Sequence, residues 1–278
     1  MPRYIDLHMH TKFSDGTSSP AELLCVVSAA NLMAFSVTDH DTLDGLRDVM
    51  NLRTSMHPEL ISGVELSVNH KGSDVHMLGY GFDIDNQPLN DALRDCAEVR
   101  DKRGRLMVDK LQSLGMSITF DQVAEIAGGG VVGRPHIATA MLKSGAVKSY
   151  EESFFKYIGN GKPAFVPKKV LLPKEAIELL HNAGGVAVLA HPVLESTWRF
   201  LDDLIADGLD GIEVYHAAHA EPDVDRFRNL ARRYRLVMTG GSDYHGRDDR
   251  HGAVGSQKVP AELYAELQRA VAERRKKI

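Results

Sequence analysis

The chain has 278 residues, of which 43% are hydrophobic and 26% are charged, a balance that predicts a packed globular protein and excludes a disordered one. The formal net charge of −5 excludes a protein that coats nucleic acid through a general basic surface, although a local basic pocket remains open. We expect a cytoplasmic protein without membrane contact, because Cys25 and Cys96 are isolated, no apolar run approaches roughly 18 residues, and no signal peptide precedes the first motif.

The first predicted element is a short strand, YIDLH (residues 4–8), which runs into two histidines and then an aspartate. Side chains alternate along a strand, so His8 and His10 point to the same side. Two imidazoles on one face suit a metal ion better than a hydrophobic core, and Asp15 follows in the next loop. On this stretch alone, two surface histidines remain an equally good interpretation.

Short apolar runs then alternate with helical patterns at about 20–30, 42–55 and 173–183, among others. The further predicted strands are MAFSVTDH (33–40), LISGVEL (60–66), VAVLAH (186–191), GIEVYH (211–216) and LVMTGGSDYH (236–245). This alternation is typical of an α/β protein with a parallel sheet or barrel. Several of these runs end in an acidic residue or a histidine, and the carboxyl ends of barrel strands carry the active site.

Residues 100–165 interrupt the alternation of strands and helices with four helical segments. We expect a helical insertion, which returns to extended chain near GKPAFVPK (161–168). Within it, GGGVVG (128–133) matches a dinucleotide-binding pattern but follows a helical segment instead of a strand, so we interpret it as a link between two helices. The predicted organisation is a barrel over residues 1–99 and 166–278, with a substrate cap at 100–165.

Nine histidines and carboxylates form a candidate metal site, and most lie at or just beyond the end of an apolar run. They are His8, His10, Asp15, His40, Glu65, His76, His191, Asp243 and His245. His76 lies within SDVHMLGYGF (73–82), a plausible alternating strand. Imidazole and carboxylate without thiolate suit Zn, Mn or Fe. Taken singly, each histidine is more simply a core or surface residue, but one barrel rim would gather the set into a multinuclear site.

The order and spacing of these motifs resemble the PHP (polymerase and histidinol phosphatase) superfamily of metal-dependent phosphoesterases. The resemblance rests on DLHMHTKFSDGTSSP (6–20), VTDHDT (37–42), GVEL (63–66), VHMLGY (75–80), AHP (190–192) and GSDYH (241–245). It implies an α/β fold, a distorted (β/α)7 barrel with a small helical insertion domain, and two to three divalent metal ions.

The resemblance also implies a division of the ligands among three metals. His8, His10, Glu65 and Asp243 would hold the first. Glu65 would bridge to the second, which His76 and His191 complete. Asp15, His40 and His245 would hold the third. Since no motif ligand is missing, the chain is expected to be an active enzyme.

The GRPHIA and GKPAFVP stretches are similar to those of short bacterial PHP phosphoesterases, which implies a small nucleotide or the end of a short oligonucleotide as substrate. We therefore expect removal of the 3′-phosphate from 3′,5′-bisphosphonucleotides by attack of a metal-bridging hydroxide. The alternative activity is 5′–3′ exoribonuclease action on short 5′-phosphorylated RNA. An amidohydrolase-like enzyme and a non-catalytic metal-stabilised binding module are the rivals, and no stable protein partner is evident.

The insertion and its flanks supply candidate phosphate ligands. Arg134 begins a predicted helix, where the helix N-terminus and the guanidinium can both bind an anion. His136 follows it, and Lys162 and Lys168 lie on the predicted returning strand. These four residues are the expected substrate-binding set.

Phosphoryl transfer needs positioning and charge neutralisation more than a covalent nucleophile, and the chain has neither a GxSxG elbow nor a CxxxxxR loop. A proton donor for the leaving group is still useful. Asp39 and His216 are the expected catalytic residues, with a metal-bound water as the alternative donor.

Overall fold

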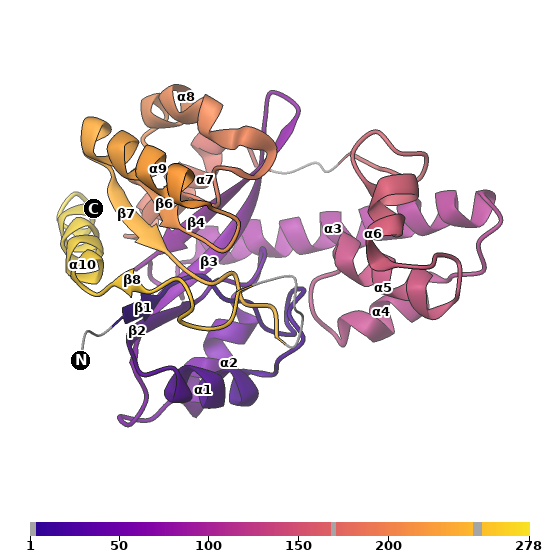
Figure 1. Cartoon of the computed structure of the whole chain (residues 1–278), viewed down its shortest axis with the longest axis horizontal. Helices are drawn as coiled ribbons and strands as arrows, with labels where there is room; N and C mark the ends of the chain where they lie inside the picture. The colour runs from indigo at the N-terminus through magenta and orange to yellow at the C-terminus, as the bar shows by residue number, and fades with distance from the viewer. Residues whose placement is uncertain (1–3, 168–170, 247–251) are drawn as a thin grey trace.

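One mixed sheet curls into a nearly closed barrel at the centre of the computed structural model, which describes residues 4–167, 171–246 and 252–278 (Figure 1). Over these residues, the strand order is β7-β6-β5-β4-β3-β2-β1-β8. The strands are β1 (Tyr4–Asp6), β2 (Leu32–Val37), β3 (Glu59–His70), β4 (Ser73–Tyr80), β5 (Val186–Leu189), β6 (Gly211–Tyr215), β7 (Val237–Gly240) and β8 (Val259–Pro260). The predicted α/β barrel is confirmed.

The strand β4 runs antiparallel to both neighbours, whereas β1–β3 and β5–β7 pair in parallel. A tight turn at Lys71 and Gly72, both with positive φ, joins β4 directly to β3, so no crossover helix separates them. The segment that follows β1 pairs with the segment that follows β7. In this pairing, the amide of Asp243 donates to the carbonyl of His8 at 2.9 Å. This pairing closes the barrel and places the ends of the first and last barrel strands side by side.

Helices cover the outside of the sheet, and their starts follow local signals. They are α1 (Pro20–Ala29), α2 (Asp44–Leu52), α7 (Pro173–Asn182), α8 (Leu201–Ala206), α9 (Glu221–Tyr234) and α10 (Glu262–Arg275), with a 3₁₀ segment η2 (Leu194–Phe200) before α8. Ser19 caps α1 and forms a capping box with Glu22, while Pro20 occupies the first turn. The main hydrophobic core lies between these helices and the sheet, and α10 packs on a second cluster with β1, β4 and β5.

The insertion consists of α3 (Gln87–Ser113), α4 (Phe120–Ala127), α5 (Arg134–Lys143), α6 (Tyr150–Ser153) and a π-helical turn η1 (Phe154–Ile158). The long helix α3 runs from the barrel into the insertion (Figure 1), so the boundary expected at residue 100 falls inside it. Leu93 packs in the barrel core, whereas Met107 belongs to a separate insertion core that extends to Ala164. The GGGVVG segment links α4 to α5, as predicted. None of the described helices, not even α3, has the length and apolar character that a membrane crossing requires.

Two anchors hold the insertion over the barrel rim. The amide of Val131 donates to the carbonyl of Phe13 at 2.9 Å, and a Cβ at Gly130 would lie only 2.6 Å from the carbonyl oxygen of Lys12. Only glycine allows this close approach. On the other side, the buried Arg100 of α3 donates to Asp41 Oδ2 at 2.7 Å. The insertion therefore lies directly against the loop that follows β1.

Candidate metal-centred active site

The barrel brings all nine predicted metal ligands to one place. His8, His10 and His40 follow β1 and β2, while the residues from the second half of the barrel follow β5 and β7. Glu65 and His76 lie within the paired strands β3 and β4. Several groups of three or four of these side chains have potential ligand atoms that all lie within 4.8 Å of one another.

Glu65 is at the centre of this cluster and is almost completely buried. Each of its two oxygens faces several imidazoles. Oε2 lies 3.1 Å from His8 Nε2, 3.2 Å from His10 Nε2 and 3.3 Å from His40 Nδ1, whereas Oε1 lies 2.8 Å from His76 Nδ1 and 3.0 Å from His191 Nε2. A carboxylate shared in this way has the geometry of a bridging ligand between neighbouring ions.

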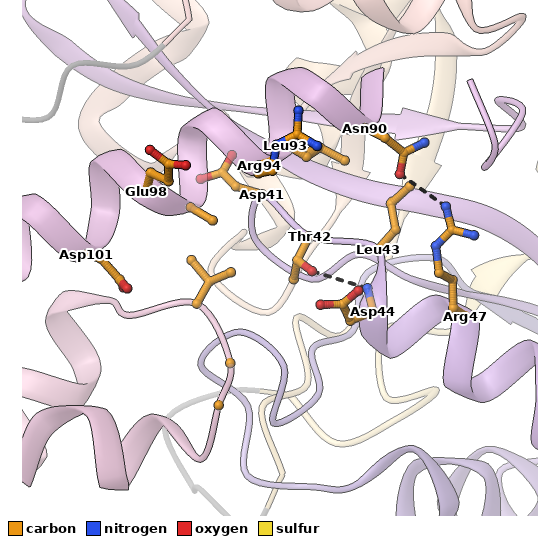
Figure 2. Close-up of a pocket in the computed structure, with 14 residues that line it drawn as sticks. Asp41, Thr42, Leu43, Asp44, Arg47, Asn90, Leu93, Arg94, Glu98 and Asp101 are labelled. Atoms are coloured by element: carbon orange, nitrogen blue, oxygen red, sulfur yellow. Dashed lines mark hydrogen bonds between the residues drawn. The ribbon is translucent and has the colours of Figure 1, made fainter. Parts of the chain in front are cut away.

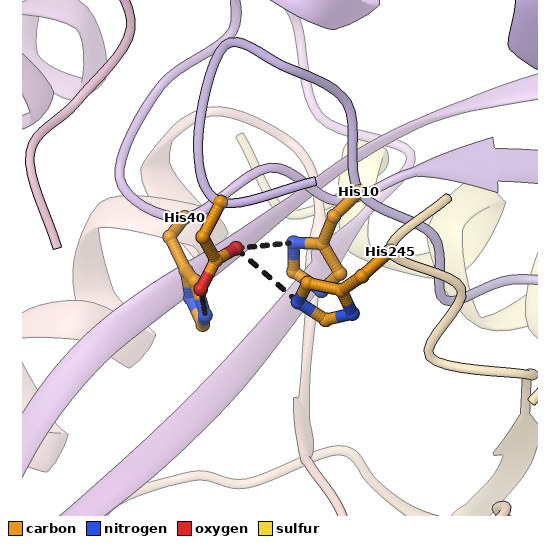
Figure 3. A group of neighbouring side chains, drawn as sticks. His10, His40 and His245 are labelled. Atoms are coloured by element: carbon orange, nitrogen blue, oxygen red, sulfur yellow. Dashed lines mark ion pairs between the residues drawn. The ribbon is translucent and has the colours of Figure 1, made fainter. Parts of the chain in front are cut away.

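His10, His40 and His245 point toward one another around the carboxylate of Asp15 (Figure 3). The shortest of these contacts joins Asp15 Oδ1 to His245 Nε2 at 3.2 Å. The group contains the residues expected at the third metal together with His10, which also belongs to a group with His8 and Asp243. His10 thus lies between two potential ion positions.

Asp243 faces the other side of the cluster, with Oδ1 3.3 Å from His8 Nε2 and 3.2 Å from His10 Nε2. Its backbone has φ +54°, in the left-handed region, and His191 has φ +24°. Strained backbone of this kind is typical of sites whose geometry the surrounding fold imposes.

Electrostatics within the cluster also suit metal ions. Burial by itself lowers the pKa of His10, but the adjacent carboxylates of Asp243 and Glu65 raise that pKa to about 10. Burial likewise opposes the ionised form of Glu65, yet the surrounding histidines hold its pKa well below the usual value. His10 Nε2, Asp15 Oδ1 and His40 Nδ1 are buried, and among the described residues they have no partner with hydrogen-bond geometry. Such converging nitrogen and oxygen donors fit divalent cations, whose binding displaces the imidazole protons.

Glu213 in β6 is a site residue that was not predicted. It is fully buried, and its Oε1 lies 3.0 Å from His8 Nδ1 while Oε2 accepts the backbone N–H of His191 at 2.7 Å. A carboxylate on the outer nitrogen of a ligand histidine fixes the tautomer that directs the other nitrogen to the metal. The sequence feature that could have indicated Glu213 is an acidic residue inside the otherwise apolar run GIEVY.

The two residues expected as proton donors lie outside the cavity lining. Asp39 is buried and accepts hydrogen bonds from the Thr11 amide, the Thr11 hydroxyl and Ser14 Oγ at 2.6–2.7 Å. His216 accepts the amide of Ala218 on Nδ1, and its Nε2 lies 3.3 Å from Asp243 Oδ2. Neither side chain faces open space where a leaving group could receive a proton. We therefore replace the expectation of proton transfer with a positioning role for both residues.

The expected substrate ligands are divided between the cavity and its surroundings. His136 lines the cavity and accepts the amide of Gly133 on Nδ1, and burial lowers its pKa. Arg134, at the start of α5, donates to Asn160 at 3.0 Å and pairs with Asp74 at 3.3 Å. Lys162 lies in a turn, not on the expected strand, with Nζ 5.0 Å from the Phe155 ring centre. Lys168 lies outside the described residues.

A cavity of about 600 Å³ opens onto the metal-ligand cluster from the side of the insertion. Its walls include Asp15, His40, Glu65, His76, His191, Asp243 and His245 on the barrel, and Ala127, Pro135, His136, Lys143 and Tyr150 on the insertion. A second cavity of about 400 Å³ lies between α2 and α3 (Figure 2). Within the described part of the chain, no potential metal-ligand group borders this second cavity, so the first is the candidate active site.

Three relatives match this chain over most of its length. A 5′-3′ exoribonuclease of Haemophilus influenzae is 32% identical over 88% of this chain and 91% of its own length. A 3′,5′-nucleoside bisphosphate phosphatase of Chromobacterium violaceum is 33% identical over 89% of this chain and 90% of its own length. A phosphoribosyl 1,2-cyclic phosphate 1,2-diphosphodiesterase of Eggerthella lenta is 31% identical over 92% of this chain and 99% of its own length.

Solved structures agree with the fold. A protein described as a metal-dependent phosphoesterase, from Bifidobacterium adolescentis, superposes with a TM-score of 0.87 at 30% identity and covers 96% of each chain. An amidohydrolase from Chromobacterium violaceum, with bound sulfate and no metal, superposes with a TM-score of 0.85 at 30% identity over 98% of this chain and 96% of that one. The PHP domain family model matches residues 6–182. The chain therefore belongs to the PHP domain family and is a PHP phosphoesterase.

Proposed function

We propose that this phosphoesterase removes the 3′-phosphate from 3′,5′-bisphosphonucleotides, releasing phosphate and leaving a 5′-nucleotide. The observation that carries the proposal is the position of one cavity between the ligand cluster and the insertion. A scissile phosphate at the cluster leaves room on the insertion side for a nucleoside and a second phosphate. The relative named as a 3′,5′-nucleoside bisphosphate phosphatase supports this substrate class.

The cluster would hold two or three divalent ions, Mn, Zn or Fe. We assign His8, His10, Glu65 and Asp243 to one ion, His76 and His191 with bridging Glu65 to another, and Asp15, His40 and His245 to the third. Bound metals of this kind activate a water and neutralise phosphoryl oxygens. The side chains of the chain fix that arrangement, and the insertion restricts access of bulk water to it.

Cationic side chains near the insertion support a second phosphate position. Arg100, Arg103 and Arg134 lie close enough to affect one another, since burial and the charges of Arg134 and Arg100 lower the pKa of Arg103 to about 10. The carboxylates of Asp41 and Asp74 pair with Arg100 and Arg134. Arg103 Nη2 is buried and has no hydrogen-bond partner among the described residues.

We therefore assign Arg134, together with Arg103, to the second phosphate, because three guanidiniums share two carboxylates and one donor is unsatisfied. A phosphate dianion would satisfy that donor. His136 lines the cavity, and Lys12 and Lys143 line it as additional cations. Lys162 and Lys168 remain weaker candidates for the same contact.

A second candidate activity is 5′–3′ trimming of short 5′-phosphorylated RNA, which the Haemophilus relative's name favours. Both activities use a phosphate at the cluster and another anionic group at a distance. They differ in whether the scissile 3′-phosphate is a terminal monoester or a diester that links the first nucleotide to the rest of an oligonucleotide.

The test compares kcat/KM for adenosine 3′,5′-bisphosphate, the matched 3′- and 5′-monophosphates, and a 5′-phosphorylated dinucleotide. We expect the bisphosphate to exceed both monophosphates by at least tenfold, since binding energy from the remote phosphate orients the scissile one. Equal values for bisphosphate and monophosphates would overturn the proposal. Preference for the dinucleotide would select the exoribonuclease activity instead.

A further inference from the structure

The cavity has apolar lining residues that metal binding and phosphate binding do not explain. Ile126 and Ala127 at the end of α4, Pro135 in α5, Tyr150 in α6 and Leu194 after β5 all line it. Phosphate groups are fully polar and gain nothing from such a surface. Apolar lining of this kind binds a flat or hydrophobic part of a ligand.

Leu194 is the apolar lining residue that the barrel contributes, and its position is unusual. It is 42% exposed, three residues beyond His191, and its amide donates to the His191 carbonyl at 2.9 Å. The next two residues, Glu195 and Ser196, have φ values of +51° and +52°. Two consecutive non-glycine residues in the left-handed region are unfavourable, and such strain is typical of ligand clamps. The fold thus holds an exposed apolar side chain at the cavity edge.

Tyr150 lines the same cavity from the insertion, at the first residue of α6. Ser149 caps that helix, and the Phe154 ring lies 5.2 Å from the Tyr150 ring, which restricts its orientation. Among the described residues that line the cavity, Tyr150 is the only one of the types Phe, Tyr and Trp. A phenol ring at a polar cavity is a stacking surface for any nucleobase.

We propose that Tyr150 and Leu194 form a nucleobase subsite, with Tyr150 stacking on the base and Leu194 providing apolar contact from the barrel side. The subsite rests on the proposed function, because it binds the nucleoside of the bisphosphonucleotide. It makes the base, and not only the two phosphates, a determinant of the reaction. Stacking accepts any base, and any preference for purines over pyrimidines follows from the larger ring area of purines alone.

The experiment measures kcat/KM for adenosine 3′,5′-bisphosphate and for the abasic tetrahydrofuran 3′,5′-bisphosphate, which keeps both phosphates and lacks the base. The ratio of the two values reports the base contact. We expect a ratio of about 10 for the unmodified protein, falling to about 1–3 for Tyr150→Leu and for Leu194→Ser. Tyr150→Phe retains the ring and should keep the ratio.

Phe155→Leu is the matched control, because Phe155 is a 73% exposed aromatic residue of the insertion that does not line the cavity. Its ratio should equal that of the unmodified protein. An unmodified ratio near 1, or an unchanged ratio in both Tyr150→Leu and Leu194→Ser, overturns the subsite. Neither result touches the preference of bisphosphate over monophosphate, so failure here is distinguishable from failure of the proposed function.

Discussion

Glu213 connects two ligand-bearing segments through one buried carboxylate. One oxygen faces His8 Nδ1 and the other accepts the amide of His191, where the backbone has a positive φ. A neutral side chain of the same shape cannot accept on both oxygens. Glu213 therefore fixes the ring of one ligand and the backbone of another.

Glu213→Gln should lower metal affinity about 10–100-fold, since the loss of an outer-sphere carboxylate typically has this effect. The measurement is calorimetric titration of the chelator-treated protein with Mn²⁺. Glu178→Gln, on the exposed face of α7, is the control and should bind as the unmodified protein does. Unchanged affinity in Glu213→Gln would show that the carboxylate only fills the core.

The sequence predicted the nine candidate ligands but not Glu213, and the reason is physical. Most of the candidate ligands lie at or just beyond the end of an apolar run, so the local pattern could indicate their positions. Glu213 lies inside a strand, and its partner His8 is 205 residues away. Nothing local distinguishes it from a solvent-facing residue until the barrel closes. The hydrogen-bond partners of Asp39 were likewise not visible in the sequence, because its three donors come from the loop after β1.

Arg134→Ala should weaken bisphosphate binding while leaving metal content unchanged. Loss of a charge-assisted phosphate contact costs about 1.5–3 kcal/mol, or roughly 10–150-fold in kcat/KM. Arg94→Ala, on the exposed side of α3, is the control. If the activity loss follows reduced metal occupancy instead, then Arg134 supports the fold through Asp74 and does not bind phosphate.

At the scale of elements, the sequence predicted the strands β1–β7 and most of the helices, but not β8, the turn that contains Lys162, or the direction of β4. The run SDVHMLGY alternates as a strand should, and alternation carries no information on direction. Direction follows from the two-residue turn at Lys71–Gly72, which is too short for a crossover. The reversal is functionally important, because it places His76 opposite Ser67, just beyond Glu65 on the neighbouring strand.

Asp210, immediately before β6, connects three elements far from the active site. Oδ2 lies 2.7 Å from His181 Nε2 and accepts the Ala187 amide at 2.9 Å, while Oδ1 accepts from Arg274 at 2.6 Å. Burial alone would raise the pKa of Asp210, but His181 and the Ala187 amide outweigh burial and lower it. One carboxylate thereby joins α7, β5 and α10.

Asp210→Asn should reduce the free energy of unfolding at neutral pH by about 1–3 kcal/mol. Because the folded-state pKa is depressed, this contribution is complete above the ordinary value of 3.8 and is lost as pH falls through the lower folded-state value. The difference in melting temperature between the unmodified protein and Asp210→Asn, both treated with chelator, should therefore become smaller below pH 3.8. Asp91→Asn on α3 should show no gap, and a pH-independent gap for Asp210→Asn would exclude the ionised carboxylate as its cause.

At the scale of the whole molecule, the ligand cluster connects parts of the barrel that are distant in sequence. Its members follow β1, β2, β5 and β7 or lie in β3 and β4, and Glu65 contacts five imidazoles from four of these positions. The insertion adds a separate core that spans Met107 to Ala164 and contributes one wall of the cavity. Ions at this position would therefore connect distant parts of the barrel, in addition to taking part in phosphate hydrolysis.

Removal of metal should consequently lower both activity and stability. A ligand at 100 times its dissociation constant adds about 2.7 kcal/mol to the folded state. For a chain of this size, that corresponds to a melting temperature higher by about 5–10 °C. Differential scanning calorimetry of chelator-treated protein, before and after addition of Mn²⁺, measures the shift, and phosphate release from a bisphosphonucleotide measures activity in the same samples.

Both quantities should recover together when the ion is restored, and Glu65→Gln should recover neither, because this change weakens the carboxylate that faces five histidines. The variant must still fold, and its far-ultraviolet circular dichroism provides that check. A metal-free protein with full activity and an unchanged melting temperature would contradict the assignment of the cluster to metal ions. Recovery of stability without activity would instead place the ion in the fold and the chemistry elsewhere in the cavity.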